Sequence, residues 1–234
     1  MNDSMKALVK AAAGPGLEIR EVPKPTPGPN EVLVKVNAAS ICGSDLHIYN
    51  WDAWSASRIK PPIIVGHEIC GEVVGRGDLV ETPVIGELVS LESHIVCNTC
   101  FYCRTGNGNM CSNTEVIGVD RDGGFAEFIA VPAENAWINP PDRPAEIAAL
   151  QEPFGNSVHT VFATDIRMKN ILVTGCGPIG LMAICVAKAT GARSVLATDV
   201  NRYRLDLARR VGADVVLHAE DDAVVERVLD ATHG

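Results

Sequence analysis

Four cysteines near the middle of the chain have the spacing of a metal site. Cys97, Cys100, Cys103 and Cys111 fall within fifteen residues as C-x2-C-x2-C-x7-C. Four thiolates this close together can surround one tetrahedral Zn²⁺ and leave no coordination position open for water or substrate. The alternatives are free thiols or an iron–sulfur cluster, which also takes four cysteines. We predict a zinc site that stabilises the local fold and takes no part in a reaction.

A second group of possible metal ligands is spread over separate segments. Cys42 lies in ICGSDLH, residues 41–47, and His67 and Glu68 lie in VGHEICG, residues 65–71. One thiolate and one imidazole, with Glu68 and Glu152 as further carboxylates, suit a zinc ion that keeps a position for water or substrate. Each of these residues alone is more commonly a small buried side chain or a satisfied polar group. Their combination predicts a catalytic zinc site.

The segment around His67 resembles the zinc signature of the medium-chain alcohol dehydrogenases. The shared motif reads Gly66-His67-Glu68-x2-Gly71-x5-Gly77-x2-Val80, and the cysteine quartet resembles the structural zinc lobe of that superfamily. Longer stretches resemble the L-threonine 3-dehydrogenase family within it, namely ICGSDLHIYNWDAW (41–54), ESHIVC (92–97), GVDRDGGFAE (118–127) and EPFGNSVHT (152–160). The resemblance extends over nearly the whole chain. It implies an N-terminal GroES-like catalytic domain followed by a Rossmann-type NAD-binding domain.

The resemblance also implies roles for single residues. Cys42 and His67 match the catalytic zinc ligands, and Glu68 matches the carboxylate that follows the ligating histidine. Glu152 matches a carboxylate near the zinc, and whether it binds the metal directly or acts through water and proton transfer is left open. Ser44 matches the hydroxyl next to the substrate alcohol, and His47 matches the histidine that passes the proton toward solvent, a task that suits imidazole near physiological pH. His94 and Trp54 are further candidates for the substrate pocket.

A glycine-rich segment in the C-terminal part has the setting of a dinucleotide-binding turn. VTGCGPIG, residues 173–180, follows a strand-like run, opens a helical run and contains G-x-G-x-x-G. Asp199 ends the next strand-like run, where an acid binds ribose hydroxyls and repels a 2′-phosphate, which favours NAD over NADP. The predicted cofactor-binding residues are Gly175, Gly177, Gly180 and Asp199, with Ile179 and Arg204 added by the resemblance.

The two halves of the chain differ in pattern. In the first half, short β-type runs separated by proline and glycine clusters are typical of an all-β barrel or sandwich. The runs are Leu17–Val22, Glu31–Val36, Ile69–Val74, Leu88–Leu91 and Phe125–Val131. Connecting helices are predicted at Pro144–Leu150 and Phe154–Asp165.

In the second half, strand-like and helical runs alternate, which indicates parallel βαβ units. The strands are Ile171–Thr174, Val195–Asp199 and Val215–Leu217, and the helices are Pro178–Thr190, Asn201–Val211 and Glu220–Thr232. We predict a two-domain α+β and α/β protein, with a catalytic domain of residues 1–160 and a Rossmann domain of residues 161–234. The second domain holds three of the roughly six strands expected, so we interpret it as truncated, with an unpaired sheet edge after its third strand.

Composition excludes several classes of protein. The 234 residues include 20 Lys+Arg and 29 Asp+Glu, and the net charge of −9 would repel nucleic-acid phosphates. The N-terminus has no secretory pattern, and the longest apolar run, Ile179–Ala187, is too short for a membrane span. We therefore expect a cytoplasmic protein with no nucleic-acid partner and no membrane segment, whose eight cysteines are metal ligands or free thiols.

These features together predict an enzyme with two zinc ions per chain, one catalytic and one structural, and NAD as cofactor. The resemblance implies hydride transfer to NAD from the carbon that carries the 3-hydroxyl of L-threonine, giving 2-amino-3-oxobutanoate. The alternatives are a polyol or 2,3-butanediol dehydrogenase of the same superfamily and a zinc-binding fragment without activity. The resemblance also implies a homotetramer for the full-length parent, and the expected truncation argues against activity of the chain alone.

Overall fold

The computed structural model describes residues 3–220 and 223–234, which form two compact units. The first unit ends at Glu152 and the second begins at Pro153, inside helix α5 (Gln151–Val161). This division lies earlier in the chain than the predicted boundary between residues 160 and 161. The physical reason is that Val158 and Val161 of α5 pack into the hydrophobic core of the second unit. Most of the connecting helix therefore belongs with the parallel sheet.

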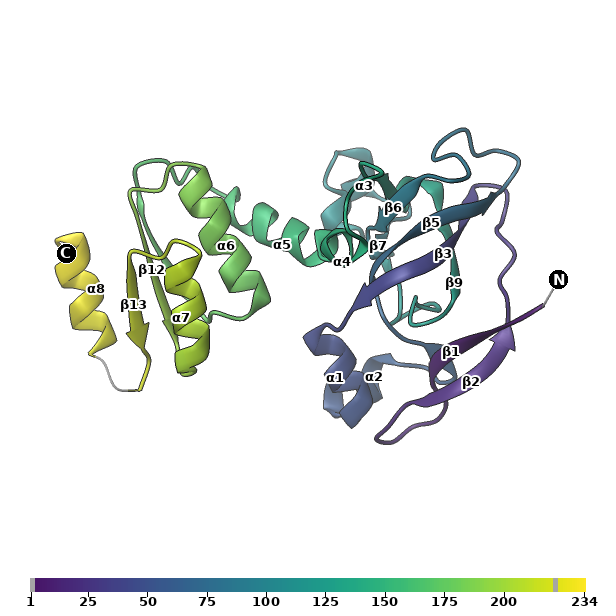
Figure 1. Cartoon of the computed structure of the whole chain (residues 1–234), viewed down its shortest axis with the longest axis horizontal. Helices are drawn as coiled ribbons and strands as arrows, with labels where there is room; N and C mark the ends of the chain where they lie inside the picture. The colour runs from purple at the N-terminus through teal and green to yellow at the C-terminus, as the bar shows by residue number, and fades with distance from the viewer. Residues whose placement is uncertain (1–2, 221–222) are drawn as a thin grey trace. The chain divides into compact units, whose positions relative to one another are not determined.

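The first unit is built around an antiparallel five-stranded sheet with the order β10-β6-β5-β3-β9. Its strands β3, β5, β6 and β9 are labelled in Figure 1. Its strands are β3 (Glu31–Ser40), β5 (Glu68–Arg76), β6 (Leu88–Leu91), β9 (Phe128–Pro132) and β10 (Ala136–Ile138). Branched aliphatic side chains on these strands form its core, among them Val32, Val34, Ile69, Val73 and Val89. This sheet positions the start of β5, where two of the predicted zinc ligands lie.

Two smaller sheets and several short helices surround this sheet. One sheet has the order β2-β1-β4, and β7 pairs with β8. The strands are β1 (Ser4–Lys10), β2 (Glu18–Pro23), β4 (Ile63–Ile64), β7 (His94–Ile95) and β8 (Glu115–Val116). The helices are α1 (Gly43–Asn50), α2 (Ala53–Arg58), α3 (Phe101–Arg104) and α4 (Ala145–Ala148), with 3₁₀ turns η1 (Gly108–Met110) and η2 (Ala133–Asn135).

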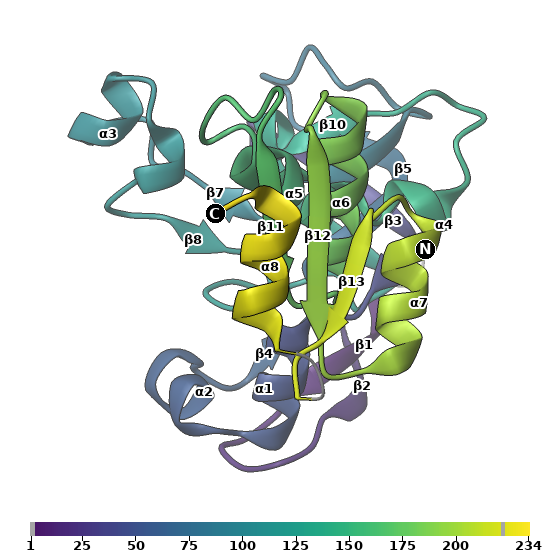
Figure 2. The same cartoon turned by 90° about the vertical axis from the view of Figure 1, so that its left-hand side faces the viewer.

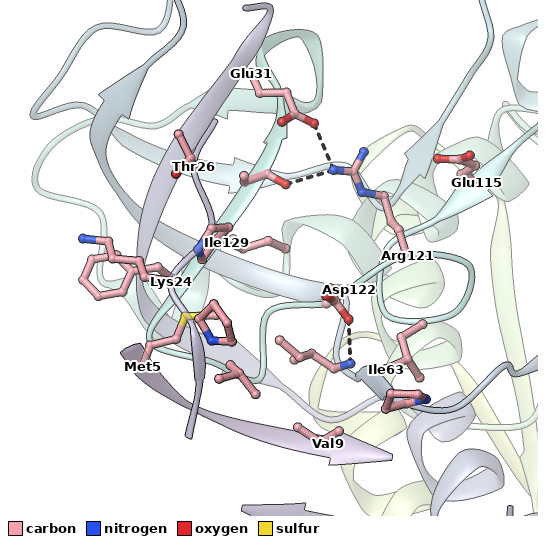
Figure 3. A pocket seen from close by; sticks show the side chains of 18 residues that line it. Met5, Val9, Lys24, Thr26, Glu31, Ile63, Glu115, Arg121, Asp122 and Ile129 are labelled. Carbon is pink, nitrogen blue, oxygen red and sulfur yellow. Dashed lines mark hydrogen bonds and ion pairs between the residues drawn. The ribbon is translucent and has the colours of Figure 1, made fainter. Parts of the chain in front are cut away.

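A hollow of about 670 Å³ lies on this unit between β1, β4 and β9 (Figure 3). Apolar side chains such as Met5 and Ile129 form part of its wall. At one end the Arg121 guanidinium donates hydrogen bonds to Glu31 Oε1 at 2.9 Å and to the Ala130 carbonyl at 3.2 Å. None of the site residues predicted from the sequence lines this hollow.

Lys10 is a fully buried cation at the end of β1. Its Nζ donates hydrogen bonds to the carbonyls of Gly14 at 2.5 Å and Gly16 at 2.9 Å, and lies 5.0 Å from the centre of the Trp51 ring. It also lies 3.5 Å from the carbonyl of Tyr49 in the last turn of α1. Burial lowers the pKa of Lys10. The side chain thus joins the turn after β1 to the end of α1.

Lys10→Met should therefore lower the free energy of unfolding by about 1–3 kcal/mol, because buried carbonyl oxygens lose their donor. Urea denaturation of the two proteins gives this difference. Lys6→Met, on an exposed position of the same strand, is the matched control and should change the free energy by less than about 0.5 kcal/mol. Equal losses in both variants would contradict the assigned role of Lys10.

The second unit is a three-stranded parallel sheet with the order β11-β12-β13 and helices beside it (Figure 2). Its elements are β11 (Asn170–Thr174), α6 (Pro178–Ala189), β12 (Ser194–Asp199), α7 (Arg202–Arg210), β13 (Val215–His218) and α8 (Val224–Thr232). Small and branched side chains form the core, including Ile184, Ala187 and Val195.

The predicted alternation of strands and helices is thus confirmed, and the bounds of the predicted helices shift, most of all for two of them. The run predicted over Phe154–Asp165 begins and ends earlier, as α5, since Asp165 instead accepts hydrogen bonds from Arg167 in the following loop. Of the run predicted over Glu220–Thr232, residues 221 and 222 lie outside the described residues, and α8 begins at Val224. No helix within the described ranges has both the length and the apolar character needed to cross a membrane.

Candidate active site

The four spaced cysteines converge in the structure. The sulfur atoms of Cys97 and Cys111 lie 3.5 Å apart, those of Cys100 and Cys103 lie 3.5 Å apart, and those of Cys100 and Cys111 lie 3.9 Å apart. A tetrahedral zinc with bonds of ~2.3 Å requires sulfur separations of about 3.8 Å. The cluster therefore has the size and donor set that zinc requires, with all four cysteines on one loop between β7 and β8.

Polar neighbours adjust the charge of this cluster. Hydrogen bonds from Thr99 and Asn113 lower the pKa of Cys97 to about 5, which favours its thiolate. Burial and the neighbouring thiols of Cys100 and Cys111 raise the pKa of Cys103 to about 12. Four thiolates at this distance repel one another, so a bound cation is required to hold all of them deprotonated.

Cys42, His67 and Glu68 form the second group. One possible ligand atom from each lies within 4.8 Å of those of the other two. Cys42 caps the N-terminus of α1, while His67 and Glu68 stand at the start of β5. Gly66 before them has φ +92° and packs so closely that a Cβ there would lie 2.3 Å from the Phe125 ring. The N-terminus of α1 and the start of β5 thus bring Cys42 and His67 together, although they are 25 positions apart in the sequence.

Electrostatic interactions within this group favour an ion pair of the Cys42 thiolate and the His67 imidazolium. The hydrogen bond with His67 lowers the pKa of Cys42, and hydrogen bonds from Ser44 act in the same direction. Burial alone would lower the pKa of His67, but Cys42 and Asp45 raise it to about 9. The buried carboxylate of Glu68 accepts a hydrogen bond from the Ser40 hydroxyl. Ser44 thus lies beside the candidate metal ligand Cys42.

Asp45 is a supporting residue that the sequence reasoning missed. Its Oδ2 accepts a hydrogen bond from the Cys42 backbone at 2.9 Å, and its Oδ1 lies 4.0 Å from His67 Nδ1. Among the described residues, these two buried atoms, Asp45 Oδ1 and His67 Nδ1, have no hydrogen-bond partner. A carboxylate behind one nitrogen of a histidine orients the other nitrogen toward a metal. The signal in the sequence was the acid three residues after a helix-capping position.

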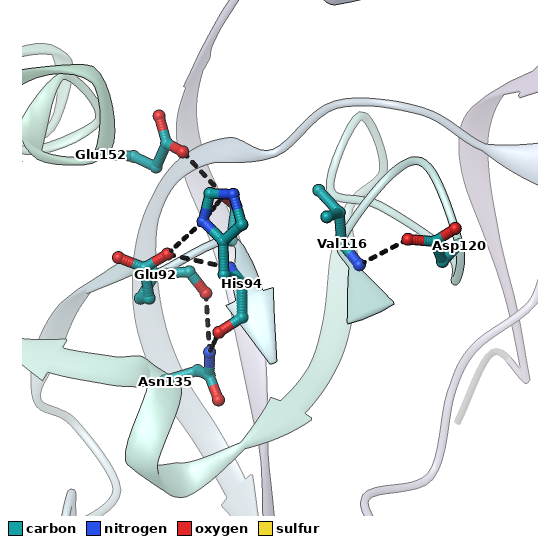
Figure 4. A network of polar contacts seen from close by, with 7 residues as sticks. Glu92, His94, Val116, Asp120, Asn135 and Glu152 are labelled. Carbon is teal, nitrogen blue, oxygen red and sulfur yellow. Dashed lines mark hydrogen bonds and ion pairs between the residues drawn. The ribbon is translucent and has the colours of Figure 1, made fainter. Parts of the chain in front are cut away.

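Glu152 lies in a neighbouring polar group with Glu92 and His94 (Figure 4). Its Oε1 accepts a hydrogen bond from Ser93 Oγ at 2.7 Å, and Glu92 Oε1 lies 2.7 Å from His94 Nδ1. Asn135 fixes this segment by donating to the carbonyls of Glu92 and His94. Glu152 also acts electrostatically on His67. The structure therefore groups Glu152 with Glu92 and His94, both of which lie in the quoted segment 92–97, rather than with Cys42, His67 and Glu68.

The remaining predicted residues of this site lie on and after α1. Ser44 is in its first turn and His47 in its last. His47 Nδ1 contacts Asp52 Oδ2 at 2.6 Å, and the Trp54 ring meets the imidazole edge-on at a centroid distance of 6.2 Å. Asp52 is a second residue that the sequence reasoning missed.

The predicted cofactor-binding residues lie around one hollow of the second unit. This hollow measures about 720 Å³, and Gly175, Gly177, Ile179, Gly180, Asp199 and Arg204 all line it. Gly175 has φ +92°, and a Cβ on Gly180 would lie 2.0 Å from the Gly175 carbonyl oxygen. A Cβ on Gly177 would meet no atom within 4 Å. The first and third glycines thus shape the turn, whereas the second leaves space that a phosphate could occupy at the start of α6.

Asp199 is buried at the end of β12 and is held in place by the backbone. Its two oxygens accept hydrogen bonds at 2.7 Å from the N–H groups of Cys176 and Asn201. Burial raises its pKa, but these donors and the charge of Arg204 outweigh burial and lower it. Arg204 Nη1 lies 3.9 Å from Asp199 Oδ2. An ionised acid beside the glycine turn has lone pairs left for ribose hydroxyls.

Comparisons with known proteins agree with this geometry. Residues 28–141 match the family "Alcohol dehydrogenase GroES-like domain", and residues 178–234 match "Zinc-binding dehydrogenase". The L-threonine 3-dehydrogenase of Symbiobacterium thermophilum is 52% identical over all 234 residues, which cover 67% of that protein.

Solved structures show the same fold. Galactitol-1-phosphate dehydrogenase from Escherichia coli superposes with a TM-score of 0.90 at 32% identity, over 97% of this chain and 66% of that one. A short chain alcohol dehydrogenase from E. coli CFT073, complexed with NADH, gives 0.87 at 33% identity, over 98% and 67%. The chain thus spans about two thirds of the length of these relatives. Its zinc-ligand clusters, glycine turn and matched domains show that the chain belongs to the zinc-containing medium-chain alcohol dehydrogenase superfamily.

Proposed function

We propose that this protein oxidises the 3-hydroxyl of L-threonine with NAD, giving 2-amino-3-oxobutanoate and NADH. The observation that carries the proposal is the convergence of Cys42, His67 and Glu68 from separate segments of the first unit. Two relatives that match the whole chain at 52% identity carry the name of this activity. A homotetramer in the full-length protein and a cytoplasmic location stay predictions that accompany the proposal.

The oxidation requires removal of a proton from the alcohol oxygen and of a hydride from its carbon. Zinc held by the Cys42 group would supply Lewis acidity, which makes the hydroxyl proton easier to remove near neutral pH. Ser44, which is hydrogen-bonded to Cys42, would receive that proton in a hydrogen bond. His47, one helical turn later, would then pass it to solvent.

The neighbouring polar group supports an amino acid as the substrate. L-Threonine carries an ammonium and a carboxylate next to its hydroxyl-bearing carbon. Glu92 and Glu152 offer negative charge to the ammonium, and His94 offers positive charge to the carboxylate. The hydrogen bond to Glu92 raises the pKa of His94 despite its partial burial, which favours the charged imidazolium. Polyols carry neither charge, so they would gain no attraction from these charged side chains.

Turnover by the full-length protein tests the proposal. The kcat/KM for L-threonine should exceed those for sorbitol and 2,3-butanediol, and equal or lower values for L-threonine would contradict the substrate. The polyol alternative has its own support, since galactitol-1-phosphate dehydrogenase shares the fold.

Zinc content tests the metal chemistry separately. We expect two zinc ions per chain, one removed readily by a chelator from the open Cys42 group and one resistant in the cysteine quartet. A single resistant ion would instead support the alternative of a zinc-binding fragment without activity.

The Asp199 carboxylate supports NAD over NADP, because it would repel a 2′-phosphate. Gly177 provides a direct test of the cofactor site. Gly177→Val fills the open space with an apolar side chain, so NADH should bind about tenfold or more weakly while the melting temperature changes little. Fluorescence titration with NADH and thermal unfolding measure both quantities.

Gly180→Ala is the contrasting variant. Its Cβ would press on the Gly175 carbonyl. This variant, unlike Gly177→Val, should therefore have a lower melting temperature than the unmodified protein. Unchanged NADH affinity in Gly177→Val would show that the cofactor does not approach this glycine.

A further inference from the structure

His47, the outer residue of the proposed proton path, contacts Asp52, which has no role in that path so far. His47 Nδ1 lies 2.6 Å from Asp52 Oδ2, the distance of a strong charge-assisted hydrogen bond. An ionised carboxylate can only accept hydrogen bonds. The proton in this bond therefore belongs to Nδ1, and Nε2 is the ring atom with a lone pair available to accept another proton.

The backbone is shaped to make this contact. Residues five apart on a continuous helix do not face one another, but α1 ends at Trp51, which has φ 56° and ψ 51°. The left-handed turn at Trp51 reverses the chain and returns Asp52 to the side chain of His47. Lys10 Nζ lies over the Trp51 ring, 5.0 Å from its centre, and helps to hold the turn.

Asp52 is also fixed from its other side. Its Oδ1 accepts a hydrogen bond at 2.9 Å from the N–H of Ser55 and so caps helix α2. The Ser55 N–H first, and then the hydrogen bond with His47, lower the pKa of Asp52, so the carboxylate is ionised. With one oxygen committed to the helix and the other to imidazole, the carboxylate holds the ring in one orientation.

We propose that Asp52 is a positioning residue for the proton relay: it fixes the Nδ1–H form of His47 and leaves Nε2 to accept the proton that leaves the substrate hydroxyl. This inference rests on the proposed function, in which Ser44 and His47 carry that proton. The transfer is balanced, because Nε2 gains the proton that the hydroxyl loses. The positive imidazolium then faces the negative Asp52 until solvent takes the proton.

Asp52→Asn in the full-length, zinc-loaded protein tests the proposal. Asparagine caps a helix as well as aspartate does, so the melting temperature should hold. The kcat for L-threonine should fall by about 10–100-fold, the range for loss of a residue that orients a functional side chain, with KM nearly unchanged. Combining it with His47→Gln gives the decisive measurement. If Asp52 acts through His47, Asp52→Asn should cause no further loss in the His47→Gln background.

The controls separate the possible failures. Asp120→Asn removes a carboxylate that binds Arg58 of α2 at 2.6 Å and should leave kcat unchanged, so a loss there would indicate that loosening α2 alone lowers activity. An additive loss in the double variant overturns the positioning role of Asp52. If His47→Gln itself has no effect, there is no relay for Asp52 to support and the inference is overturned, although L-threonine oxidation can still hold. If L-threonine is not oxidised at all, the proposed function fails instead. ¹⁵N NMR of the His47 ring still tests the inference then, since a predominantly Nε2–H form overturns it.

Discussion

Cys42→Ser is expected to leave one zinc ion per chain instead of two and to lower kcat by about 10³-fold, since a Lewis-acid metal contributes several kcal/mol. The variant should remain folded. Cys42 is the N-cap of α1 and is only partly buried, and the hydrogen bond that its backbone N–H donates to Asp45 does not need the thiol. Elemental analysis of zinc, L-threonine turnover and thermal unfolding measure the three expectations.

Cys185→Ser is the matched control, because Cys185 is exposed on α6 and belongs to neither cluster. It should retain both zinc ions and full activity. Two zinc ions in Cys42→Ser would show that His67 and Glu68 hold the metal with other ligands. A lost zinc ion with unchanged turnover would show that the reaction does not depend on this metal.

The features that could be predicted from the sequence are those whose signal is local. The cysteine quartet occupies one loop, so its spacing alone indicated a closed cluster. The alternation of strands and helices after residue 165 predicted the parallel unit, because each element carries its own periodicity. The glycine turn was recognisable for the same reason, since its three glycines and the strand–helix junction are contiguous.

Contacts between distant or irregular segments could not be predicted in this way. Helix α1 buries only Asp45 and Ile48 and has no apolar stripe. Its sequence therefore lacks the helical periodicity from which a helix can be predicted. The Asp52 contact depends on a left-handed Trp51, which the sequence does not signal because tryptophan rarely adopts that conformation. The spatial grouping of Glu152 with Glu92 depends on tertiary packing.

Strand order is a further limit of sequence reasoning. The prediction placed an unpaired edge after the third strand, β13. Among the described residues β11 is also an edge, since it pairs with β12 alone. In a doubly wound sheet of order 3-2-1-4-5-6 the first strand lies in the interior, so the number of a strand along the chain does not by itself tell which edge of the sheet is open.

Cys103→Ser is expected to release the resistant zinc ion and to unfold the loop of residues 97–113. This loop has little apolar core, since Phe101 is 74% exposed and Met110 is 56% exposed. Structural zinc contributes about 10–16 kcal/mol in small zinc-binding domains, far more than the short helix and turn of this loop can supply. Zinc analysis should therefore give one ion per chain, and limited proteolysis should cut within the loop.

A variant that changes only the packing of this loop distinguishes stabilisation by metal from stabilisation by side-chain contacts. Phe101→Ala removes the largest exposed side chain but leaves all four sulfur ligands, so this variant should keep both zinc ions and resist cleavage. Chelation of the unmodified protein under denaturing stress should expose the same cleavage site as Cys103→Ser. If Cys103→Ser keeps its loop intact with one zinc lost, side-chain and backbone contacts such as those of Asn113 with Cys97 and Cys111 hold the loop, and the metal is dispensable for its fold.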